Sequence, residues 1–301
     1  MEKALNYIDI FAGCGGLSTG LFNAGWHGLF AVEKNADAFS TLKFNLIDTV
    51  PHFVWPEWLS MEAHDINELI SKNEDNLKAL RGHVTLVAGG PPCQGFSMAG
   101  KRNANDQRNK LVESYIQFIK LVAPQVIIFE NVHGFTVNFK DKKGAKQYSM
   151  YVEQALTEEG YQVAHSIIDM SHFGIPQNRK RFILVAMKGH DPKRVFAVLA
   201  ESREAFCKEK GIMCTTSVRD AISDLEKSCG TVPSPDTKGF NAGIYGTIQS
   251  GYQKLMRQKL STDTRTVNSH RFVNHRTDTV KLHENLLRTA PRGKRITPTD
   301  G

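Results

Sequence analysis

The sequence of 301 residues lacks the features that mark membrane-spanning and secreted proteins. It contains no long uninterrupted apolar run, so we expect no membrane span. Residues 1–7 carry no basic segment followed by an apolar core, which argues against a secretory signal. A hydrophobic content of 41% is ordinary for a globular protein, and the length suffices for one large domain or two of ordinary size.

Cysteine is scarce and irregularly placed. The five cysteines are Cys14, Cys93, Cys207, Cys214 and Cys229. Their odd number and their spacing fit neither a disulfide framework nor a zinc-binding pattern. We therefore expect a reducing, cytoplasmic setting and no metal site.

Acidic residues are few in the last part of the chain. Residues 241–301 hold 11 basic and 4 acidic residues, whereas residues 1–240 hold 27 of each, so the net charge of +7 lies entirely in the C-terminal part. A localised basic excess is typical of a surface that binds a polyanion such as nucleic acid. A solvated loop region that is basic by chance explains the composition equally well, so the charge alone leaves both interpretations open.

Residues 1–187 alternate short apolar runs with amphipathic stretches. The apolar runs predict strands over 7–12, 29–32, 84–88, 126–129, 163–168 and 181–186. One helical face is formed by Leu111, Tyr115, Phe118, Ile119 and Val122, and Pro124 ends that helix just before the next strand. This alternation predicts an α/β fold with a mainly parallel sheet and helices on both of its faces.

The pattern weakens after residue 215. Residues 231–246 are rich in proline and glycine and are expected to form loops. We therefore predict one domain over 1–215 and a second, smaller region over 216–301.

A glycine turn follows the first predicted strand, in "YIDIFAGCGGLSTGL" (7–21). Gly13, Gly15 and Gly16 allow a tight turn and a close approach of a ligand to the backbone. Glu33 ends the next strand, where an acidic residue binds ribose hydroxyls in open α/β sheets. Asp65 is expected near the edge of a third strand, where it would meet an adenine amino group, although an aspartate in front of a helix is more often a cap.

A cysteine turn follows the strand at 84–88, which we expect to be the fourth of the sheet, in "LVAGGPPCQGFSMAGKR" (86–102). Two glycines and two prolines end the strand, so Cys93 is expected at the carboxyl edge, where ligands bind. A lone cysteine is usually a buried structural residue. Turn residues before Cys93 and polar residues after it favour a nucleophile instead.

Four segments resemble, in order and spacing, the motifs of the DNA cytosine-5 methyltransferases. They are "DIFAGCGGLSTGL" (9–21), "GGPPCQGFSMAGKR" (89–102), "FENVHGF" (129–135) and "QNRKR" (177–181). The resemblance extends from about residue 7 to residue 186. It implies a Rossmann-like domain that binds S-adenosylmethionine and methylates C5 of a cytosine in double-stranded DNA.

The resemblance also implies roles for individual residues. The thiolate of Cys93 would add to C6 of a flipped-out cytosine, while Glu130 contacts N3 of the ring. The catalytic set is completed by Arg179 and Arg181, which hold the base and lower the pKa of the thiol. Burial is expected to keep a proton on Glu130; a strand-end ion pair is the alternative for Glu130, and a solvated charge cluster for the arginines.

The remaining implied contacts concern cofactor and DNA. The cofactor set comprises Phe11, Gly13, Gly15, Gly16, Leu17, Glu33, Asp65, Ile66 and Pro92. The DNA-contacting set comprises Gln94, Ser97, Lys101, Arg102 and Gln177. The first four lie in a polar segment, residues 94–110, that is expected to close over the flipped base.

Two motifs that normally follow in this family, one with "QGFP"-like residues and one of the form "GN-x-V-x-P", are not found. Residues 217–225 and 274–295 resemble the early part of a target-recognition region. We expect the larger, N-terminal chain of a two-polypeptide restriction-modification methyltransferase that needs a second polypeptide, with a truncated gene product as the alternative explanation.

Two other functions stay open. One is an inactive fragment that binds cofactor or DNA, and the other is an RNA cytosine-5 methyltransferase. The joint presence of Cys93, Glu130, Arg179 and Arg181 favours catalysis over decay. The turn "PPCQGFS" and the basic C-terminal part favour DNA as the substrate.

Overall fold

The computed structural model describes residues 5–92, 110–136, 139–141, 144–146, 148–261 and 264–291. The chain forms two compact units, the first comprising residues 1–173 and 178–204 and the second residues 174–177 and 205–301. The division falls within helix α7 (Lys193–Glu209), earlier than the expected change at 215/216. Within the described ranges, no helix combines the length and the apolar character needed to cross a membrane.

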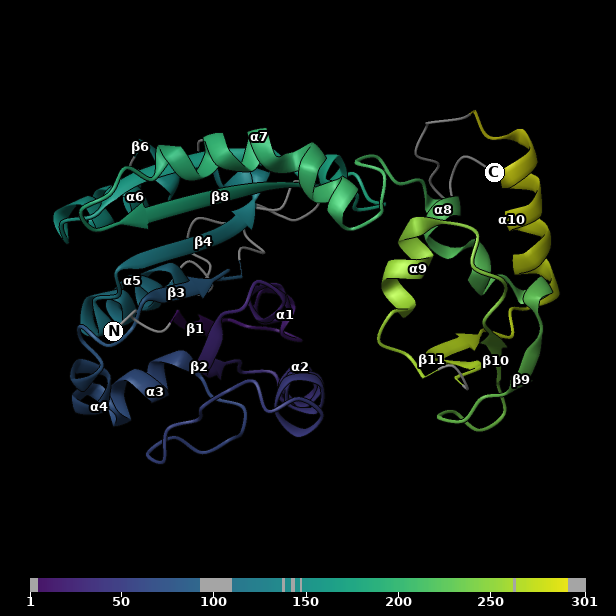
Figure 1. Cartoon of the computed structure of the whole chain (residues 1–301), viewed down its shortest axis with the longest axis horizontal. Coiled ribbons are helices and arrows are strands. Elements are labelled where there is room, and N and C mark those ends of the chain that lie inside the picture. Colours follow the sequence, from purple (N-terminus) through teal and green to yellow (C-terminus); the bar gives the residue numbers. More distant parts are fainter. Residues whose placement is uncertain are drawn as a thin grey trace. The chain divides into compact units, whose positions relative to one another are not determined.

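A six-stranded sheet of order β2-β1-β3-β4-β8-β7 forms the centre of the first unit (Figure 1). Its strands are β1 (Asn6–Ile10), β2 (His27–Val32), β3 (Leu86–Gly89), β4 (Val126–Val132), β7 (Gln162–Asp169) and β8 (Lys180–Met187). The first four are parallel to their neighbours, whereas β8 and β7 add to the sheet in antiparallel fashion. The sheet is therefore mixed and mostly parallel, and all six predicted strands form.

One detail of the predicted topology is wrong. The strand at 84–88 was expected to be fourth, but it is β3, the third strand along the chain. No named strand lies between β2 and β3 in residues 33–85, all of which the structure describes; only an isolated bridge joins Phe53 to Gly28. Asp65 therefore follows no strand and instead caps a helix.

Helices cover both faces of the sheet, as the alternating pattern predicts. One face packs against α3 (Ile66–Lys72), α4 (Glu74–Ala79), α5 (Lys110–Val122) and α6 (Tyr148–Glu158). The other packs against α1 (Gly16–Asn23), α2 (Ala36–Lys43) and the π-helical turn η1 (Phe44–Asp48). Successive side chains of β1 point to opposite faces, so Ile8 belongs to the first apolar cluster and Tyr7 to the second.

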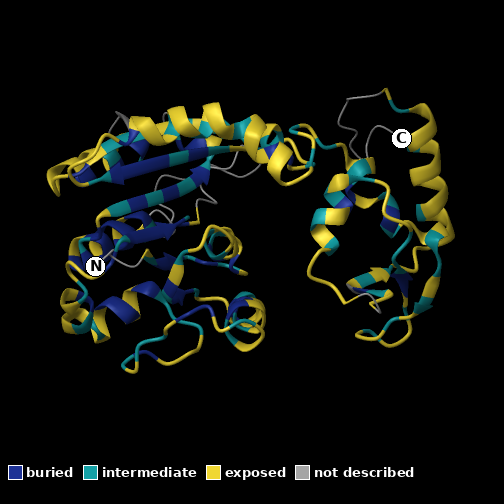
Figure 2. Cartoon of the chain, in the orientation of Figure 1, coloured by how far each residue is buried: buried dark blue, intermediate teal, exposed yellow. Residues whose placement is uncertain are grey.

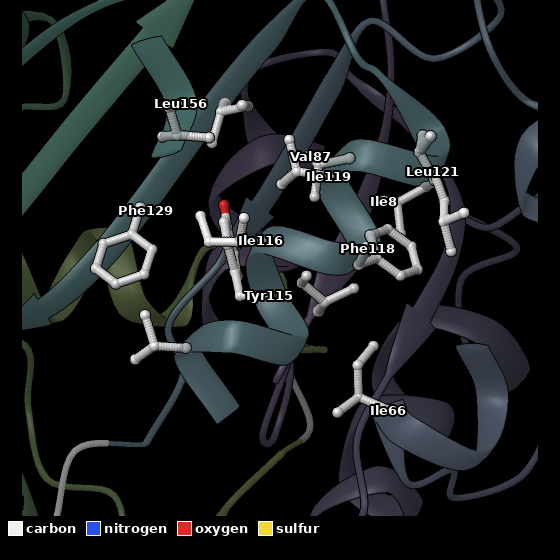
Figure 3. Close-up of a cluster of buried hydrophobic side chains, with 14 of the residues drawn as sticks. Ile8, Ile66, Val87, Tyr115, Ile116, Phe118, Ile119, Leu121, Phe129 and Leu156 are labelled. Atoms are coloured by element: carbon white, nitrogen blue, oxygen red, sulfur yellow. The ribbon is translucent and has the colours of Figure 1, made fainter. Parts of the chain in front are cut away.

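Helix α5 shows how sequence pattern becomes core. Tyr115, Phe118 and Ile119 are fully or almost fully buried against strand residues such as Val87 and Phe129 (Figure 3). The helix ends at Val122, before Pro124, and β4 begins two residues after the proline. The predicted face and the predicted stop are both confirmed.

Shorter elements complete the first unit beyond β4. They are η3 (His133–Thr136), the hairpin of β5 (Phe139–Asp141) and β6 (Gly144–Lys146), and η4 (Met170–Phe173).

The second unit contains a three-stranded antiparallel sheet of order β11-β10-β9. Its elements are α8 (Val218–Ile222), η5 (Ser223–Leu225), η6 (Lys227–Cys229), β9 (Thr231–Pro233), β10 (Asn241–Ile244), α9 (Gly251–Arg257), β11 (Thr266–Phe272) and α10 (Thr277–Thr289). The prediction of loops over 231–246 is thus wrong for β9 and β10. Gly243 allows β10 to pack closely against the ring of His270, because a Cβ would lie 2.5 Å from that ring.

A buried ion pair holds part of the second unit together. Arg257 pairs with Asp224 of η5, donates to the carbonyl of Gly246 at 3.0 Å and stacks on the ring of Tyr245. In contrast, none of the residues of α10 is buried (Figure 2).

An ionisable side chain lies at the centre of the main sheet. Asp9 of β1 is fully buried, opposite Ala31 and Ala88 on the two flanking strands. Its Oδ2 accepts a hydrogen bond of 2.6 Å from the hydroxyl of Ser18 on α1, and its Oδ1 has no partner among the described residues. Burial raises the pKa of Asp9 to about 7.

We expect Asp9→Asn to stabilise the protein more at pH 8 than at pH 5. The unfolded chain releases this proton near pH 3.8 and the folded chain near pH 7, so the wild type loses stability as the pH rises between these values. The advantage of the variant should grow by ~3 kcal/mol between pH 5 and pH 8.

Thermal or urea unfolding of both proteins at the two pH values measures this effect. Asp37→Asn, at an exposed carboxylate in the first turn of α2, is the matched control and should show no such pH dependence. Equal pH profiles for wild type and Asp9→Asn would contradict a neutral buried carboxyl.

Candidate active site

The strand order creates a crevice at the carboxyl edge of the sheet. The chain leaves β1 towards β2 on one side and returns to β3 on the other, so the loops after β1 and β3 diverge. A cavity of about 250 Å³ lies at this point. It is lined by Phe11, Val32, Glu33, Lys34, His64, Asp65, Ile66, Gly90, Pro92 and Leu111.

The glycine turn after β1 has an unusual backbone. Phe11, Gly13 and Gly15 all have positive φ, of 61°, 57° and 86°. For a bulky residue such as Phe11 this conformation is strained, at about 1–3 kcal/mol, and such strain is typical of functional sites. At Gly15 a side chain would also be crowded, since a Cβ would lie 3.1 Å from Leu42 and Leu46.

Glu33 holds the glycine turn directly. Its Oε2 accepts a hydrogen bond of 2.9 Å from the N–H of Gly13, and its Oε1 accepts one of 2.7 Å from the N–H of Asn35. A carboxylate offers about four acceptor positions, so both oxygens can still accept from a ligand in the cavity. The sequence assigned Gly13 and Glu33 to one cofactor site, and the structure joins them by a hydrogen bond that was not predicted.

Asp65 is both a helix cap and part of the cavity wall. Its Oδ1 accepts from the N–H groups of Asn67 at 2.8 Å and Glu68 at 3.4 Å, which caps α3. Its Oδ2 lies 2.9 Å from Nζ of Lys34. Lys34 first, and the helix amides after it, hold the pKa of Asp65 below its usual value.

The last glycine of β3 and the glycine after it, Gly89 and Gly90, lie close to neighbouring groups. A Cβ at Gly89 would lie 2.6 Å from the carbonyl oxygen of Ile10 and 2.9 Å from the ring of Tyr115. A Cβ at Gly90 would lie 2.8 Å from Oε2 of Glu130. These glycines therefore let β3 pass closely between β1, α5 and the Glu130 side chain.

Glu130 and Arg181 form an ion pair across two strands. In the antiparallel register, Glu130 of β4 pairs with Ile183 of β8, so Arg181 is its diagonal neighbour. Nε of Arg181 lies 2.7 Å from Oε1 of Glu130. Glu130 retains 30% exposure, so it is the partner of an arginine rather than a carboxyl isolated in an apolar environment.

Several predicted site residues lie elsewhere or outside the description. Arg179 is exposed, and its carbonyl accepts a hydrogen bond from the N–H of Met170. Leu17 packs in the apolar cluster around Tyr7, Gly16 opens α1 without lining the cavity, and Gln177 belongs to the second unit. Five predicted residues fall outside the described residues: Cys93, Gln94, Ser97, Lys101 and Arg102.

The structure adds residues that sequence reasoning missed. Asn131 is buried and its Nδ2 donates to the carbonyl of Pro91 at 3.2 Å, which ties the turn after β3 to β4. Lys34 and His64 line the cavity. The available signal was a polar residue directly beside a predicted one, as in "VEKN", "AHDI" and "FENV". Within the described ranges, no group of three or more His, Cys, Asp or Glu residues is arranged to hold a metal ion.

We expect Gly89→Ala to lower the free energy of unfolding by about 1–3 kcal/mol, because the new methyl group meets a backbone carbonyl that cannot rotate away. Urea unfolding measures the loss. Gly20→Ala in α1, where a Cβ meets nothing within 4 Å, is the matched control and should stabilise slightly. Equal stabilities of the two variants would show that β3 has room to spare.

Comparison with known proteins gives the family. The family model described as C-5 cytosine-specific DNA methylase matches residues 5–299. The chain is 33% identical over 225 residues to the type II methyltransferase M.DdeI of Desulfomicrobium norvegicum, covering 73% of this chain and 48% of that protein. It is 30% identical over 234 residues to the type II methyltransferase M.AquIA of Picosynechococcus sp., covering 75% of this chain and 90% of that protein.

The chain spans about half the length of the first curated relatives that it matches. A DNA modification methyltransferase encoded within an E. coli prophage has a similar structure, with a TM-score of 0.55 and 23% identity over 83% of this chain and 64% of that chain. This likeness concerns the fold. Because the family model matches almost the whole of this chain, the chain belongs to the C-5 cytosine-specific DNA methylase family.

Proposed function

We propose that the chain transfers a methyl group from S-adenosylmethionine to C5 of a cytosine within a specific sequence of double-stranded DNA. The observation that carries the proposal is the cavity at the carboxyl edge of the sheet. It gathers Phe11, Glu33, Asp65, Ile66 and Pro92 from four separate segments, and its Gly90 touches the Glu130–Arg181 pair.

The cavity suits S-adenosylmethionine by the chemistry of its walls. Both carboxylates line the cavity, and we assign Glu33 to the ribose diol and Asp65 to the adenine amino group. Phe11, Ile66 and Leu111 provide apolar surface for the purine ring. The two carboxylates also match the positive charge of the cofactor, which when bound supplies an electrophilic methyl group.

The reaction begins at Cys93, which follows the cavity residue Pro92 directly in the chain. The thiolate adds to C6 of a flipped-out cytosine, and the electron pair of the C5–C6 bond makes C5 nucleophilic. Once C5 carries the methyl group, a base removes the C5 proton, the C6–S bond breaks and the thiolate is restored.

Glu130 supports this addition with a proton on the oxygen that Arg181 does not hold, which it donates in a hydrogen bond to N3 of the ring, where negative charge develops. Arg181 restrains one oxygen of Glu130, and Gly90 leaves room for the other. Arg179 is assigned to the base and its neighbouring groups. The two arginines also bring positive charge to the carboxyl edge of the sheet, where β3 ends shortly before Cys93. Positive charge near the thiol favours the thiolate.

Contacts to DNA are assigned to Gln94, Ser97, Lys101, Arg102 and Gln177, with the basic excess of residues 241–301 meeting phosphates. A restriction-modification setting is supported by the relatives, which are named as type II methyltransferases.

The test is methyl transfer by Cys93→Ala. We expect the rate of labelled methyl transfer to duplex DNA to fall by roughly a thousandfold or more, since removal of a nucleophile abolishes the covalent route. A duplex with 5-fluorocytosine at the target should trap the wild type covalently, because C5 then carries no removable proton, and should not trap the variant.

Cys14→Ser, at an exposed cysteine of the glycine turn, is the control and should retain trapping. Transfer RNA offered in parallel separates DNA from RNA as the substrate. Wild-type rates in Cys93→Ala would refute the nucleophile, and absence of transfer by the assembled wild type would favour a binding protein.

We further propose that full activity needs a second polypeptide carrying the "GN-x-V-x-P" and "QGFP"-like motifs. The match with M.AquIA covers 90% of that protein, so M.AquIA has little sequence beyond the part that resembles this chain. Helix α10 also has no buried residue and leaves the apolar side chains of Val280, Leu282 and Leu287 exposed, and such apolar surface is available to a partner.

We expect methyl transfer by the purified chain to rise at least tenfold when the product of the adjacent reading frame is added, since a closed cofactor pocket raises both affinity and positioning. Transfer of labelled methyl groups at equal concentrations of the first chain measures the gain. Full activity of the chain alone would contradict the need for a partner.

A further inference from the structure

Lys34 forms part of the cavity wall. It follows Glu33 at the end of β2, and its side chain lines the cavity while Nζ lies 2.9 Å from Oδ2 of Asp65. The Lys34 side chain is 78% exposed and that of Asp65 is 20% exposed. The ion pair therefore joins the end of β2 to the start of α3 across the cavity wall.

The hydrogen bonds of Asp65 divide between its two oxygens. Oδ1 is occupied by the N–H groups of Asn67 and Glu68, and these bonds belong to the cap of α3. Oδ2 makes no bond to the helix and is occupied by Lys34. Oδ2 has a second acceptor position, so a ligand that donates to Asp65 must share this oxygen with the lysine ammonium, which draws its negative charge away from the ligand.

Lys34 is not needed to prepare Asp65 for binding. The two helix amides already fix the orientation of the carboxylate. An aspartate with a usual pKa of 3.8 is ionised at neutral pH without a lysine beside it. The remaining consequence of the ion pair is that the lysine ammonium takes one of the two acceptor positions of Oδ2 of Asp65.

We propose that Lys34 is a specificity-determining residue that competes with the purine amino group for Oδ2 of Asp65. This inference rests on the proposed function, because it takes the cavity as the adenosine site. The lysine lowers the contribution of the amino group to binding, and so sets how tightly the adenosine part of cofactor and product is held.

The expected effect is small and dependent on salt. An ion pair with a largely exposed lysine contributes little, so its removal should tighten binding by about three- to fivefold. Salt screens exposed charges, so raising the ionic strength should tighten adenosine binding to the wild type in the same direction.

The experiment compares adenosine with purine riboside, which lacks the amino group, on the full chain. Dissociation constants are measured by ligand-observed NMR for wild type and Lys34→Met, whose side chain keeps the apolar stem without the charge. S-adenosylhomocysteine is measured on both proteins as well. We expect Lys34→Met to bind adenosine about three- to fivefold more tightly and purine riboside within twofold of the wild type.

Lys72→Met is the matched control, because Lys72 also forms an exposed ion pair on α3, with Glu68 at 2.9 Å, but does not line the cavity. It should leave both constants unchanged. Weaker adenosine binding by Lys34→Met, or an equal change for both nucleosides, would overturn the competition while leaving the adenosine site intact. Failure of both proteins to bind adenosine and S-adenosylhomocysteine, alone and with the second polypeptide added, would overturn the proposed function as well.

Discussion

The site depends on one carboxylate that joins two strand ends. Parallel strands β1 and β2 end side by side, and the chain after each must turn away from the sheet. Glu33 accepts the N–H of Gly13 from one turn and that of Asn35 from the other, which fixes both turns against each other. The strained Phe11 and the N-terminal end of α1 are positioned by the same contact, so the wall of the cavity follows from it.

A second set of contacts shapes the side of the cavity at the end of β3, where close packing favours glycine. Gly89 allows β3 to approach Ile10, Gly90 gives way to Glu130, and Asn131 ties the turn to β4 through the carbonyl of Pro91. Gly90 belongs to both regions, since it lines the cavity and touches the carboxylate that Arg181 holds. The cavity proposed for the cofactor and the carboxylate proposed to contact the cytosine are therefore neighbours at Gly90.

The sequence predicted what depends on periodicity and on chain order. The six strands and the end of α5 before Pro124 follow from local patterns. The sequence could not show that the glycine-rich stretch around Gly243 forms strands. That glycine is needed because its backbone packs against the ring of His270, which is distant in the chain. The contacts of Lys34 and Asn131 were missed for the same reason, since each depends on a partner in another segment.

The double use of Glu33 has a consequence for how the protein responds to ligand. One carboxylate orders the glycine turn and faces the cavity, so turn order and occupancy are thermodynamically linked. A ligand that binds only the ordered turn must stabilise it by the same free energy by which the ordered turn favours the ligand. Hydrogen exchange at the amides of the turn would then slow on binding.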